Sequence, residues 1–374
     1  MKNSITQLEI NKMNNPNYYV AIMAGGIGSR FWPQSRTGYP KQFLDILNTG
    51  KSLIQWTFER YAAFVPKENI YVVTAKEYSH ICAEQLPDIP VENIIAEPSR
   101  KNTAPCVAYI SFKLLLQNPN AALIVAPSDH MIADTATFTE ISKKALEFVS
   151  NNNAFITLGI KPTYPNTGYG YIQYDQNDDA GNGIYRVKTF TEKPDLEIAK
   201  KFLESGDFLW NGGIFIWKAK DVVDAFEKYD LETFELFDAE KQHLNTPQEK
   251  EAIERIYPLC KNVAIDIALM EKAENVFVIP SSFGWSDLGT WTSAYDNLEK
   301  DYLGNAVASD NVIIIDATKC MISAPKDKLL VLQGLEDFVV IDTKDALLIC
   351  KKEKEQAIKE YVAEVKRSKG DKYL

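Results

Sequence analysis

A glycine-rich segment followed by basic residues lies near the start of the chain, between residues 19 and 43. It opens with a short, partly β-branched apolar run, Tyr19–Met23, which predicts a buried parallel strand. Glycines after such a strand let backbone N–H groups approach a phosphate without a Cβ in between, and basic side chains neutralise its charge. The residues placed to do this are Ala24, Gly25, Gly26, Gly28, Ser29, Arg30 and Lys41. The segment therefore predicts a binding site for a polyphosphate.

Two common phosphate loops do not fit this segment. The dinucleotide fingerprint GxGxxG requires glycine where the chain has Phe31, and the P-loop requires Gly-Lys-Ser/Thr, whereas Lys41 follows Pro40. The segment instead resembles the loop of the nucleoside-diphosphate-sugar pyrophosphorylases, GGxGxRxxPxS followed by a Pro-Lys pair. The runs 30–36 (RFWPQSR) and 40–43 (PKQF) are similar to the mannose-1-phosphate guanylyltransferase branch in particular. The alternative is a glycine-rich strand-to-helix turn with a surface arginine and lysine.

Composition and charge narrow the class of protein. With 374 residues, 45% of them hydrophobic, the chain is long enough for one large α/β domain and a smaller one. The formal net charge of −10 argues against general nucleic-acid binding, so an anionic substrate must be met by a local cluster of Lys, Arg and metal. The five scattered cysteines contain no CxxC pair, which favours free buried thiols in a reducing cytoplasm.

Both membrane insertion and secretion are disfavoured by the apolar pattern. Residues 1–17 are polar and Asn-rich and lack the apolar core of a signal peptide, and no apolar run is long enough to span a membrane. We therefore expect a flexible N-terminal tail over 1–17, no membrane partner and a cytoplasmic protein.

Helical and strand patterns alternate along the first half of the chain. Helices are predicted over 52–64, 77–86, 105–116 and 138–150, and strands over 69–74, 93–96, 122–126 and 154–159. This alternation predicts an α/β fold with a doubly wound, mostly parallel sheet. The resemblance implies a Rossmann-like nucleotidyltransferase domain of the GT-A-like type, which we expect to cover residues 18–299.

Glu97 follows the strand predicted over 93–96. A carboxylate there can accept hydrogen bonds from the N1–H and N2–H groups of guanine, a pair of donors that adenine lacks. The resemblance places this Glu-Pro segment near the base, together with Asn102 and Thr103 of the Asn-Thr-Ala-Pro run that follows. The alternative is that Glu97 caps the next helix or faces solvent.

Asp129 follows the strand predicted over 122–126, after Ser128. Mg²⁺ takes one or two protein carboxylates and fills its other positions with phosphate and water, so Asp129 is a candidate metal ligand beside a nucleotide. The resemblance adds Asp287, in the run 283–291 (FGWSDLGTW), as the second ligand of the same Mg²⁺. The alternative for Asp287 is the N-cap of the helix predicted near 289–298. No chemical role is assigned to His130.

Three short motifs between residues 169 and 217 resemble the sugar-phosphate site of the family. Tyr169-Gly170 brings backbone polar groups close to a ligand. Glu192 and Lys193 offer a carboxylate for sugar hydroxyls and an ammonium for the sugar phosphate. Asn211 precedes Gly212 and Gly213, where the family often has serine in place of Gly212, so no side-chain role is expected at that position.

The pattern changes beyond residue 300. Short apolar runs at 312–315, 329–332, 338–341 and 346–349 predict a small all-β unit, and an amphipathic helix is predicted over 352–367. Spacing leaves a sandwich or barrel open, whereas the resemblance implies a left-handed β-helix-like domain over 300–374 and favours a homodimer through it. No isomerase half, as found in bifunctional relatives, is expected after this unit.

The resemblance implies a mannose-1-phosphate guanylyltransferase that joins GTP to mannose 1-phosphate and releases pyrophosphate, with Mg²⁺ as cofactor. Arg30, Lys41 and Lys193 are the expected catalytic cations. Two alternatives stay open: another nucleotide and sugar phosphate, such as UTP or dTTP with glucose 1-phosphate or GTP with another hexose or heptose 1-phosphate, and a non-catalytic sensor of nucleotide sugars.

Overall fold

The computed structural model describes residues 15–374, so most of the predicted N-terminal tail lies outside the described part of the chain. These residues form two compact units. Unit 1 contains the described residues up to 25 together with 58–127 and 132–285, and unit 2 contains 26–57, 128–131 and 286–374. Because the units group residues by contact, unit 2 takes in the glycine-rich segment from Gly26 onward as well as the C-terminal strands. The division of the chain between residues 299 and 300 stays a prediction.

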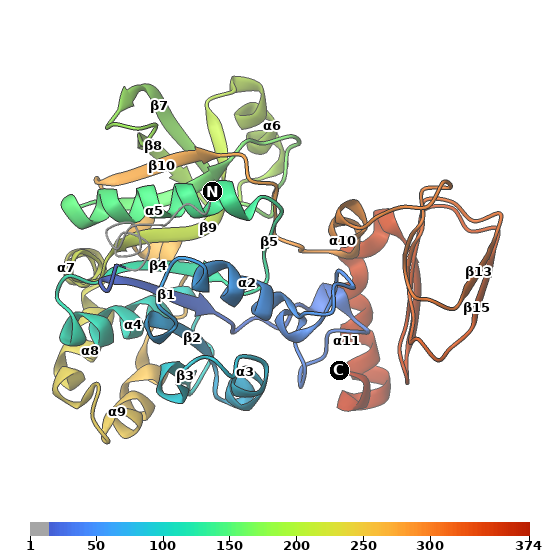
Figure 1. Ribbon diagram of the computed structural model, residues 1–374, viewed down its shortest axis with the longest axis horizontal. Helices are drawn as coiled ribbons and strands as arrows, with labels where there is room; N and C mark the ends of the chain where they lie inside the picture. Colours follow the sequence, from blue (N-terminus) through green and yellow to red (C-terminus); the bar gives the residue numbers. More distant parts are fainter. Residues whose placement is uncertain (1–14) are drawn as a thin grey trace, which may run out of the picture. The chain divides into compact units, whose positions relative to one another are not determined.

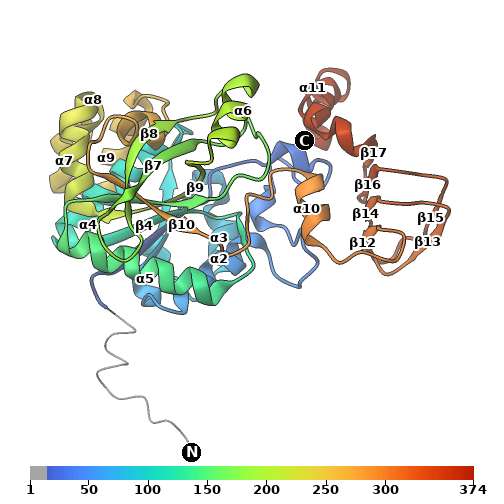
Figure 2. The same ribbon diagram turned by 90° about the horizontal axis from the view of Figure 1, so that it is seen from above.

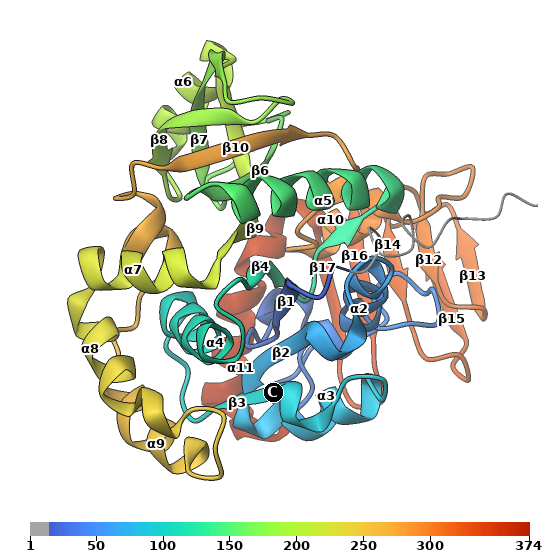
Figure 3. The ribbon, with the colours of Figure 1, turned by 60° about the vertical axis from the view of Figure 1, so that its left-hand side comes forward.

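Unit 1 is built on a nine-stranded sheet with the order β3-β2-β1-β4-β9-β6-β10-β8-β7. Figure 3 shows β3 at one end of this sheet and β7 and β8 at the other. The strands are β1 (Tyr18–Met23), β2 (Ile70–Ala75), β3 (Ile94–Glu97), β4 (Ala122–Pro127), β6 (Phe155–Ile160), β7 (Tyr171–Asp179), β8 (Tyr185–Thr191), β9 (Phe208–Lys218) and β10 (Val276–Ser281).

The predicted parallel arrangement is found where strands and helices alternate. β3, β2, β1 and β4 pair in parallel, and so do β6 and β10. β9 runs antiparallel between β4 and β6, and the β7–β8 hairpin is antiparallel as well. The α/β fold class is confirmed, but the sheet is mixed because β9 enters its middle from the opposite direction.

Helices cover both faces of the sheet, as a doubly wound fold requires. Tyr19 and Ala21 of β1 belong to one apolar cluster with the buried side of α4 (Thr103–Gln117), while the alternate residues Val20 and Ile22 are equally buried on the other face. Figure 2 shows α5 (Thr135–Asn151) on one side of the sheet and α7 (Ala219–Tyr229) on the other. The remaining helices of this region are α2 (Leu53–Ala62), α3 (Ser79–Gln85), α6 (Leu196–Ser205), α8 (Leu231–Glu240) and α9 (Glu249–Ile256).

Unit 2 contains a parallel coil of short strands. β12, β14 and β16 form one parallel ladder, and β13 and β15 form a second one. Successive strands of the chain therefore alternate between these two ladders. Figure 1 labels β13 and β15 of this coil. Its strands are β12 (Ala306–Ala308), β13 (Val312–Ile315), β14 (Met321–Ser323), β15 (Leu330–Gln333) and β16 (Phe338–Asp342). β17 (Leu347–Lys351) then pairs antiparallel with β16 and is followed by α11 (Ile358–Lys369). β12 and β14 were not predicted because each has only three residues.

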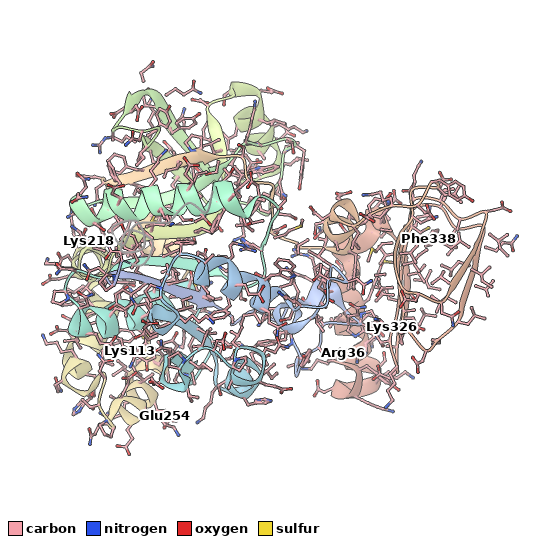
Figure 4. All side chains as sticks on the ribbon, in the orientation of Figure 1. Arg36, Lys113, Lys218, Glu254, Lys326 and Phe338 are labelled. Carbon is pink, nitrogen blue, oxygen red and sulfur yellow. The ribbon has the colours of Figure 1, made fainter. Side chains whose placement is uncertain are left out.

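The C-terminal part of unit 2 packs against the segment that follows the glycines. Phe31, in the short 3-10 helix Ser29–Phe31, shares an apolar cluster with Trp291 of α10 (Trp291–Asn297) and with Ile358. Arg36, labelled in Figure 4, donates to the Asp345 carboxylate over 2.7 Å. The loop is therefore held by side chains that lie more than 250 positions later in the chain.

Two composition-based predictions have structural counterparts. All five cysteines are unpaired and buried, as expected for free thiols. Among residues 15–374, no helix combines the length and the apolar character needed to cross a bilayer.

Two further strands have two residues each, β5 (Met131–Ile132) and β11 (Trp285–Ser286).

Candidate active site

The glycine-rich segment turns sharply at Gly28. This residue has φ +68° and ψ 42°, a left-handed conformation that L side chains rarely adopt. A Cβ at this position would lie 2.4 Å from Cβ of Lys41, so no side chain fits. Ser35 supports the turn by donating through Oγ to the Ile27 carbonyl over 2.6 Å. Glycine at position 28 therefore lets the backbone of the turn lie directly against the Lys41 side chain.

Lys41 is buried and connects the two predicted metal ligands. Its Nζ donates to Asp129 Oδ2 over 3.0 Å and to the Asp287 backbone carbonyl over 3.0 Å, and it lies 5.2 Å from the centre of the Phe31 ring. Burial raises the pKa of the Asp129 carboxyl, but the charges of Lys41 and His130 outweigh it, and the pKa lies below its ordinary value. The sequence predicts Lys41 as a catalytic cation, and in the structure its ammonium is paired with Asp129.

Asp287 does not cap a helix. The N-cap of α10 is Thr290, whose side chain and that of Ser293 form a reciprocal capping box. The Asp287 side chain accepts from Gly289 N over 3.0 Å, within a tight turn in which Leu288 has a positive φ. The turn presents Asp287 toward the same place as Asp129.

These residues line one cavity of about 300 Å³. Its walls come entirely from unit 2 and are formed by Gly28, Ser29, Arg30, Lys41, Asp129, His130, Asp287, Gly289 and Lys359. Nε of Arg30 is buried and has no hydrogen-bond partner among the described residues. A buried guanidinium atom without an acceptor costs free energy, and an anion in the cavity would remove that cost.

The carboxylates in this cavity fit a hard divalent cation. Among residues 15–374 there is no group of three or more His, Cys, Asp or Glu side chains that could enclose a metal ion. Asp129 and Asp287 nevertheless line the same cavity, and Mg²⁺ is bound in this way when substrate phosphates supply the other ligands. The donor set therefore fits a metal that arrives with a polyphosphate.

In unit 1, strand register brings Glu97 beside the first glycines. Met23 is level with Val73 of β2, and Val73 is level with Ile95 of β3, so Glu97 stands two residues further along, level with Gly25. A Cβ on Gly25 would lie 3.5 Å from Glu97 Oε2. Ala24 is fixed on the same strand end by its N–H bond to the Val73 carbonyl over 2.7 Å.

Glu97 is a buried carboxyl that is held by one donor. The Tyr257 hydroxyl donates to its Oε1, and no other side-chain donor to Glu97 is found among the described residues. Burial raises the pKa of Glu97 to about 7, although the Tyr257 hydrogen bond lowers it. Neither alternative for Glu97 holds, because the side chain is 8% exposed and α4 is capped by Asn102.

Asn102 and Thr103 make structural contacts. The Asn102 side chain accepts from Thr103 N over 2.9 Å as the N-cap of α4, and Asn102 has φ +65°. The Thr103 hydroxyl accepts from Ile265 N over 2.8 Å. Their predicted contact with a nucleotide base stays a prediction, and their observed contacts join α4 to the segment before residue 266.

Glu192 and Lys193 lie together at the end of β8. Lys193 Nζ donates to Glu192 Oε1, while Glu192 Oε2 is buried and has no hydrogen-bond partner among residues 15–374. A Cβ on Gly170 would lie 2.6 Å from that oxygen, so a side chain there would displace the Glu192 carboxylate. Lys193 also has a left-handed backbone, with φ +49°. A buried acceptor beside an ammonium suits a polyhydroxylated anion.

Asn211 is hydrogen-bonded to Asp266, a residue that the sequence did not single out as a site candidate. Asn211 lies inside β9 rather than at its start, and its Nδ2 donates to Asp266 Oδ1 over 2.8 Å. Its Oδ1 accepts from Gly213 N over 3.1 Å, where Gly213 has φ +68°. Burial and the Glu192 carboxylate raise the pKa of Asp266 to about 7.

Tyr169 lines the same region through its ring. The ring packs against Trp210 at 5.1 Å and against Trp285 at 5.3 Å between centroids. Aromatic rings packed in this way present apolar faces, beside the polar groups of Glu192 and Asn211.

Known proteins share both parts of this architecture. A family model described as nucleotidyl transferase matches residues 19–302, and one described as a MannoseP isomerase/GMP-like beta-helix domain matches residues 310–365. The chain belongs to the nucleotidyl transferase family. The second match confirms the β-helix-like character of the C-terminal strands.

Relatives of this nucleotidyltransferase cover nearly all of the chain. The alginate biosynthesis protein AlgA of Pseudomonas putida is 36% identical over 91% of this chain and 70% of its own length. A mannose-1-phosphate guanylyltransferase, RfbM of Salmonella typhimurium, is 35% identical over 96% of this chain and 74% of its own length. A crystal structure titled as a mannose-1-phosphate geranyltransferase from Thermus thermophilus superposes with a TM-score of 0.84 at 28% identity, covering 94% of this chain and 99% of that one.

Two site residues of this nucleotidyltransferase escaped sequence reasoning. Asp266 opens the π-helix Asp266–Met270, in a stretch where the sequence predicts no site motif. π-Helical turns often occur at functional sites, but nothing in the local pattern predicts them. Lys359 lies on a helix whose apolar face alone was predicted, and only the tertiary fold brings it to the cavity.

Proposed function

We propose that the chain is a mannose-1-phosphate guanylyltransferase, forming GDP-mannose and pyrophosphate from GTP and mannose 1-phosphate. The observation that carries the proposal is the unit 2 cavity, where Arg30 presents a buried, unbonded Nε and Lys41 is bonded to Asp129. Such a site suits charge-stabilised nucleotidyl transfer. The sugar and base are supported by the name of the Salmonella relative.

The reaction joins two anions at the α-phosphorus of GTP. An oxygen of mannose 1-phosphate forms the new P–O bond while the bond between the α-phosphorus and the bridging oxygen breaks, and the electron pair leaves with pyrophosphate. A sugar phosphate has a second pKa near ~6, by analogy with phosphorylated side chains, so its oxygen is already anionic at neutral pH. No general base is required, and the protein contributes mainly positioning and charge neutralisation.

Asp129 and Asp287 are proposed to hold Mg²⁺, which when bound neutralises the nucleotide phosphates and polarises the reacting phosphorus. Lys41 holds the Asp129 carboxylate and the backbone of Asp287, since its Nζ donates to Asp129 Oδ2 and to the Asp287 carbonyl. Gly26, Gly28 and Ser29 would present backbone N–H groups to the phosphates, with Arg30 beside them. Ser128 is fixed through its carbonyl, which accepts from Thr57 over 3.1 Å.

Lys193 is proposed to bind the attacking sugar phosphate. Its side chain is 61% exposed and, within residues 15–374, is paired only with Glu192, so it can turn toward an incoming phosphate at little cost. Glu192 Oε2, Asn211 and the backbone at Gly170 and Gly213 would then meet the sugar hydroxyls. The buried, unpartnered Glu192 oxygen supports this assignment.

Glu97 is proposed to select guanine. A carboxylate has about four acceptor positions on its two oxygens, so the Tyr257 bond to Oε1 leaves room for both guanine donors. Ala24 and Gly25, at the neighbouring strand end, would form the adjacent wall, with Asn102 and Thr103 at the start of α4.

We also propose a homodimer through the β13–β15 face of the coil. Ile313 and Val331 are directly paired across these strands and are 50% and 57% exposed, and Ile315 lies on the same face at 45%. An apolar group of this kind on a flat sheet favours association with a second copy. A working place in the cytoplasm is supported by the five unpaired cysteines.

The test measures pyrophosphate release with Mg²⁺, crossing GTP, ATP, UTP and dTTP with mannose, glucose and fucose 1-phosphates. Turnover confined largely to GTP with mannose 1-phosphate is expected. Lys193→Gln should raise KM for the sugar phosphate, whereas Lys200→Gln, on an exposed lysine paired with Glu197, should leave it unchanged. Turnover with a different pair would overturn the substrate assignment, and GTP binding without turnover on any pair would indicate a sensor.

A further inference from the structure

Lys359 contributes a third cation to the phosphate cavity. It is the second residue of α11 (Ile358–Lys369) and lines the same cavity as Arg30 and Lys41. Lys41 is already paired with Asp129. Neither Arg30 nor Lys359 forms an ion pair with any side chain in the described part of the chain.

Packing, rather than charge, holds Lys359 in this place. Ile358 is fully buried in the cluster that contains Phe31, and Val362 and Val365 of α11 pack against that cluster. In the 3-10 helix Gly370–Tyr373 that follows α11, the Tyr373 carbonyl accepts from the Trp32 indole over 2.8 Å. The helix is thus fastened along its length to residues that directly follow Arg30.

The two unpaired cations repel each other. The charge of Arg30, followed by burial, lowers the pKa of Lys359 below its ordinary value. Like charges held close together by apolar packing are a cost that a bound anion relieves. The cavity also contains the glycine turn, whose backbone suits phosphate oxygens.

We propose that Lys359 is a phosphate-binding residue that contacts the two phosphates leaving as pyrophosphate. This inference rests on the proposed nucleotidyl transfer and deepens it. Arg30 and Lys359 would bind these phosphates, while Lys41 remains bonded to the Asp129 carboxylate and the Asp287 backbone carbonyl. The C-terminal helix therefore supplies part of the binding site and is more than a support for the β coil.

The experiment measures binding of inorganic pyrophosphate with Mg²⁺ by calorimetry, and the KM for pyrophosphate in the reverse reaction with GDP-mannose. Lys359→Gln should weaken both by roughly 10-fold or more, the usual loss for a charge-assisted contact. Lys359→Arg should restore most of the affinity because it keeps the charge. Lys366→Gln is the matched control, since Lys366 is on the same helix but pairs with Asp371 in solvent.

The outcomes separate this inference from the proposed function. A pyrophosphate affinity of Lys359→Gln within twofold of the wild type, at an unchanged Tm, would overturn the role of Lys359 even if the enzyme turns over normally. Conversely, Lys359-dependent pyrophosphate binding by a protein that makes no GDP-mannose would keep the inference and reject the proposed substrates. If Lys359→Gln lowers the Tm, the pyrophosphate affinity of Lys359→Arg decides. An affinity near that of the wild type supports a role for the charge, whereas a loss as large as that of Lys359→Gln overturns it. A KM for GDP-mannose that rises as much as that for pyrophosphate would also contradict the proposal.

Discussion

The substitution Tyr257→Phe is expected to shift the pH dependence of kcat/KM for GTP and to leave that of kcat/KM for mannose 1-phosphate unchanged. The Tyr257 hydroxyl donates to Glu97 Oε1 and lowers a pKa that burial has raised to about 7. Removing the hydroxyl withdraws a hydrogen bond to a charged group, a contribution of about 1.5–3 kcal/mol. At 1.36 kcal/mol for each pKa unit, the pKa of Glu97 should rise by about one to two, to about 8–9.

The expected effect on activity follows from the ionised fraction of Glu97. With a pKa of about 7, about half of the carboxyl is ionised at pH 7, and after the substitution about 1–10% is ionised. Since only the carboxylate accepts both guanine donors, kcat/KM for GTP at pH 7 should fall roughly 5- to 50-fold and recover above pH 9. The kcat/KM for mannose 1-phosphate at saturating GTP should keep its pH profile.

The assay is pyrophosphate release between pH 5.5 and 9.5 for the wild type and the variant. Tyr109→Phe is the matched control, because the Tyr109 ring packs against Tyr257 at 6.5 Å between centroids, but its hydroxyl donates to the partly buried Glu249 carboxylate and not to Glu97. Its profile for GTP should coincide with that of the wild type. If the Tyr257→Phe profile also coincides with the wild type, Glu97 does not read the base and the reasoning is refuted.

Three further outcomes are expected from other parts of the molecule. Asp287→Asn should lower turnover by roughly 10²–10³ at an unchanged Tm, judging from comparable electrostatic contacts, and normal turnover would remove Asp287 from the metal site. Gly28→Ala should lower the Tm, because a left-handed alanine costs roughly 1–2 kcal/mol and its Cβ would collide with the Lys41 side chain, whereas Gly38→Ala, with nothing within 4 Å, should not. Ile313→Glu should convert a dimer to a monomer in light scattering, and a dimer that persists would place the interface elsewhere.

The sequence predicts the features that depend on local pattern. The turn at Gly28 and the strand before it are encoded within a few residues, as are the runs that became β13 and β16, so these predictions are confirmed. The start of the helix predicted from residue 52 is local too: Ser52 N donates to Gln55 Oε1 over 2.9 Å, and Ser52 Oγ accepts from Gln55 N over 3.4 Å.

Features that depend on distant contacts were not predictable. The antiparallel entry of β9 between β4 and β6 follows from tertiary pairing, since its apolar run is equally compatible with either direction. Lys359 and Asp266 look like surface charges in the sequence, because the tertiary fold decides which groups lie beside a charged side chain. Lys359 lines a cavity only once α11 lies beside Arg30, and Asp266 is part of a polar cluster only once Asn211 donates to it.

Glu97 also connects the binding chemistry to stability. Its folded pKa of about 7 is above the ordinary value of 4.5, so its contribution to stability is complete below pH 4.5 and is lost as the pH rises through 7. The difference of 2.5 units corresponds to about 3 kcal/mol once the carboxyl is ionised. A ligand that donates hydrogen bonds to the carboxylate returns part of this free energy. GTP should therefore raise the Tm more at pH 8 than at pH 6, and Glu97→Gln, which carries no charge at either pH, should remove that difference. An equal stabilisation of the wild type at both pH values would show that bound GTP does not reach Glu97.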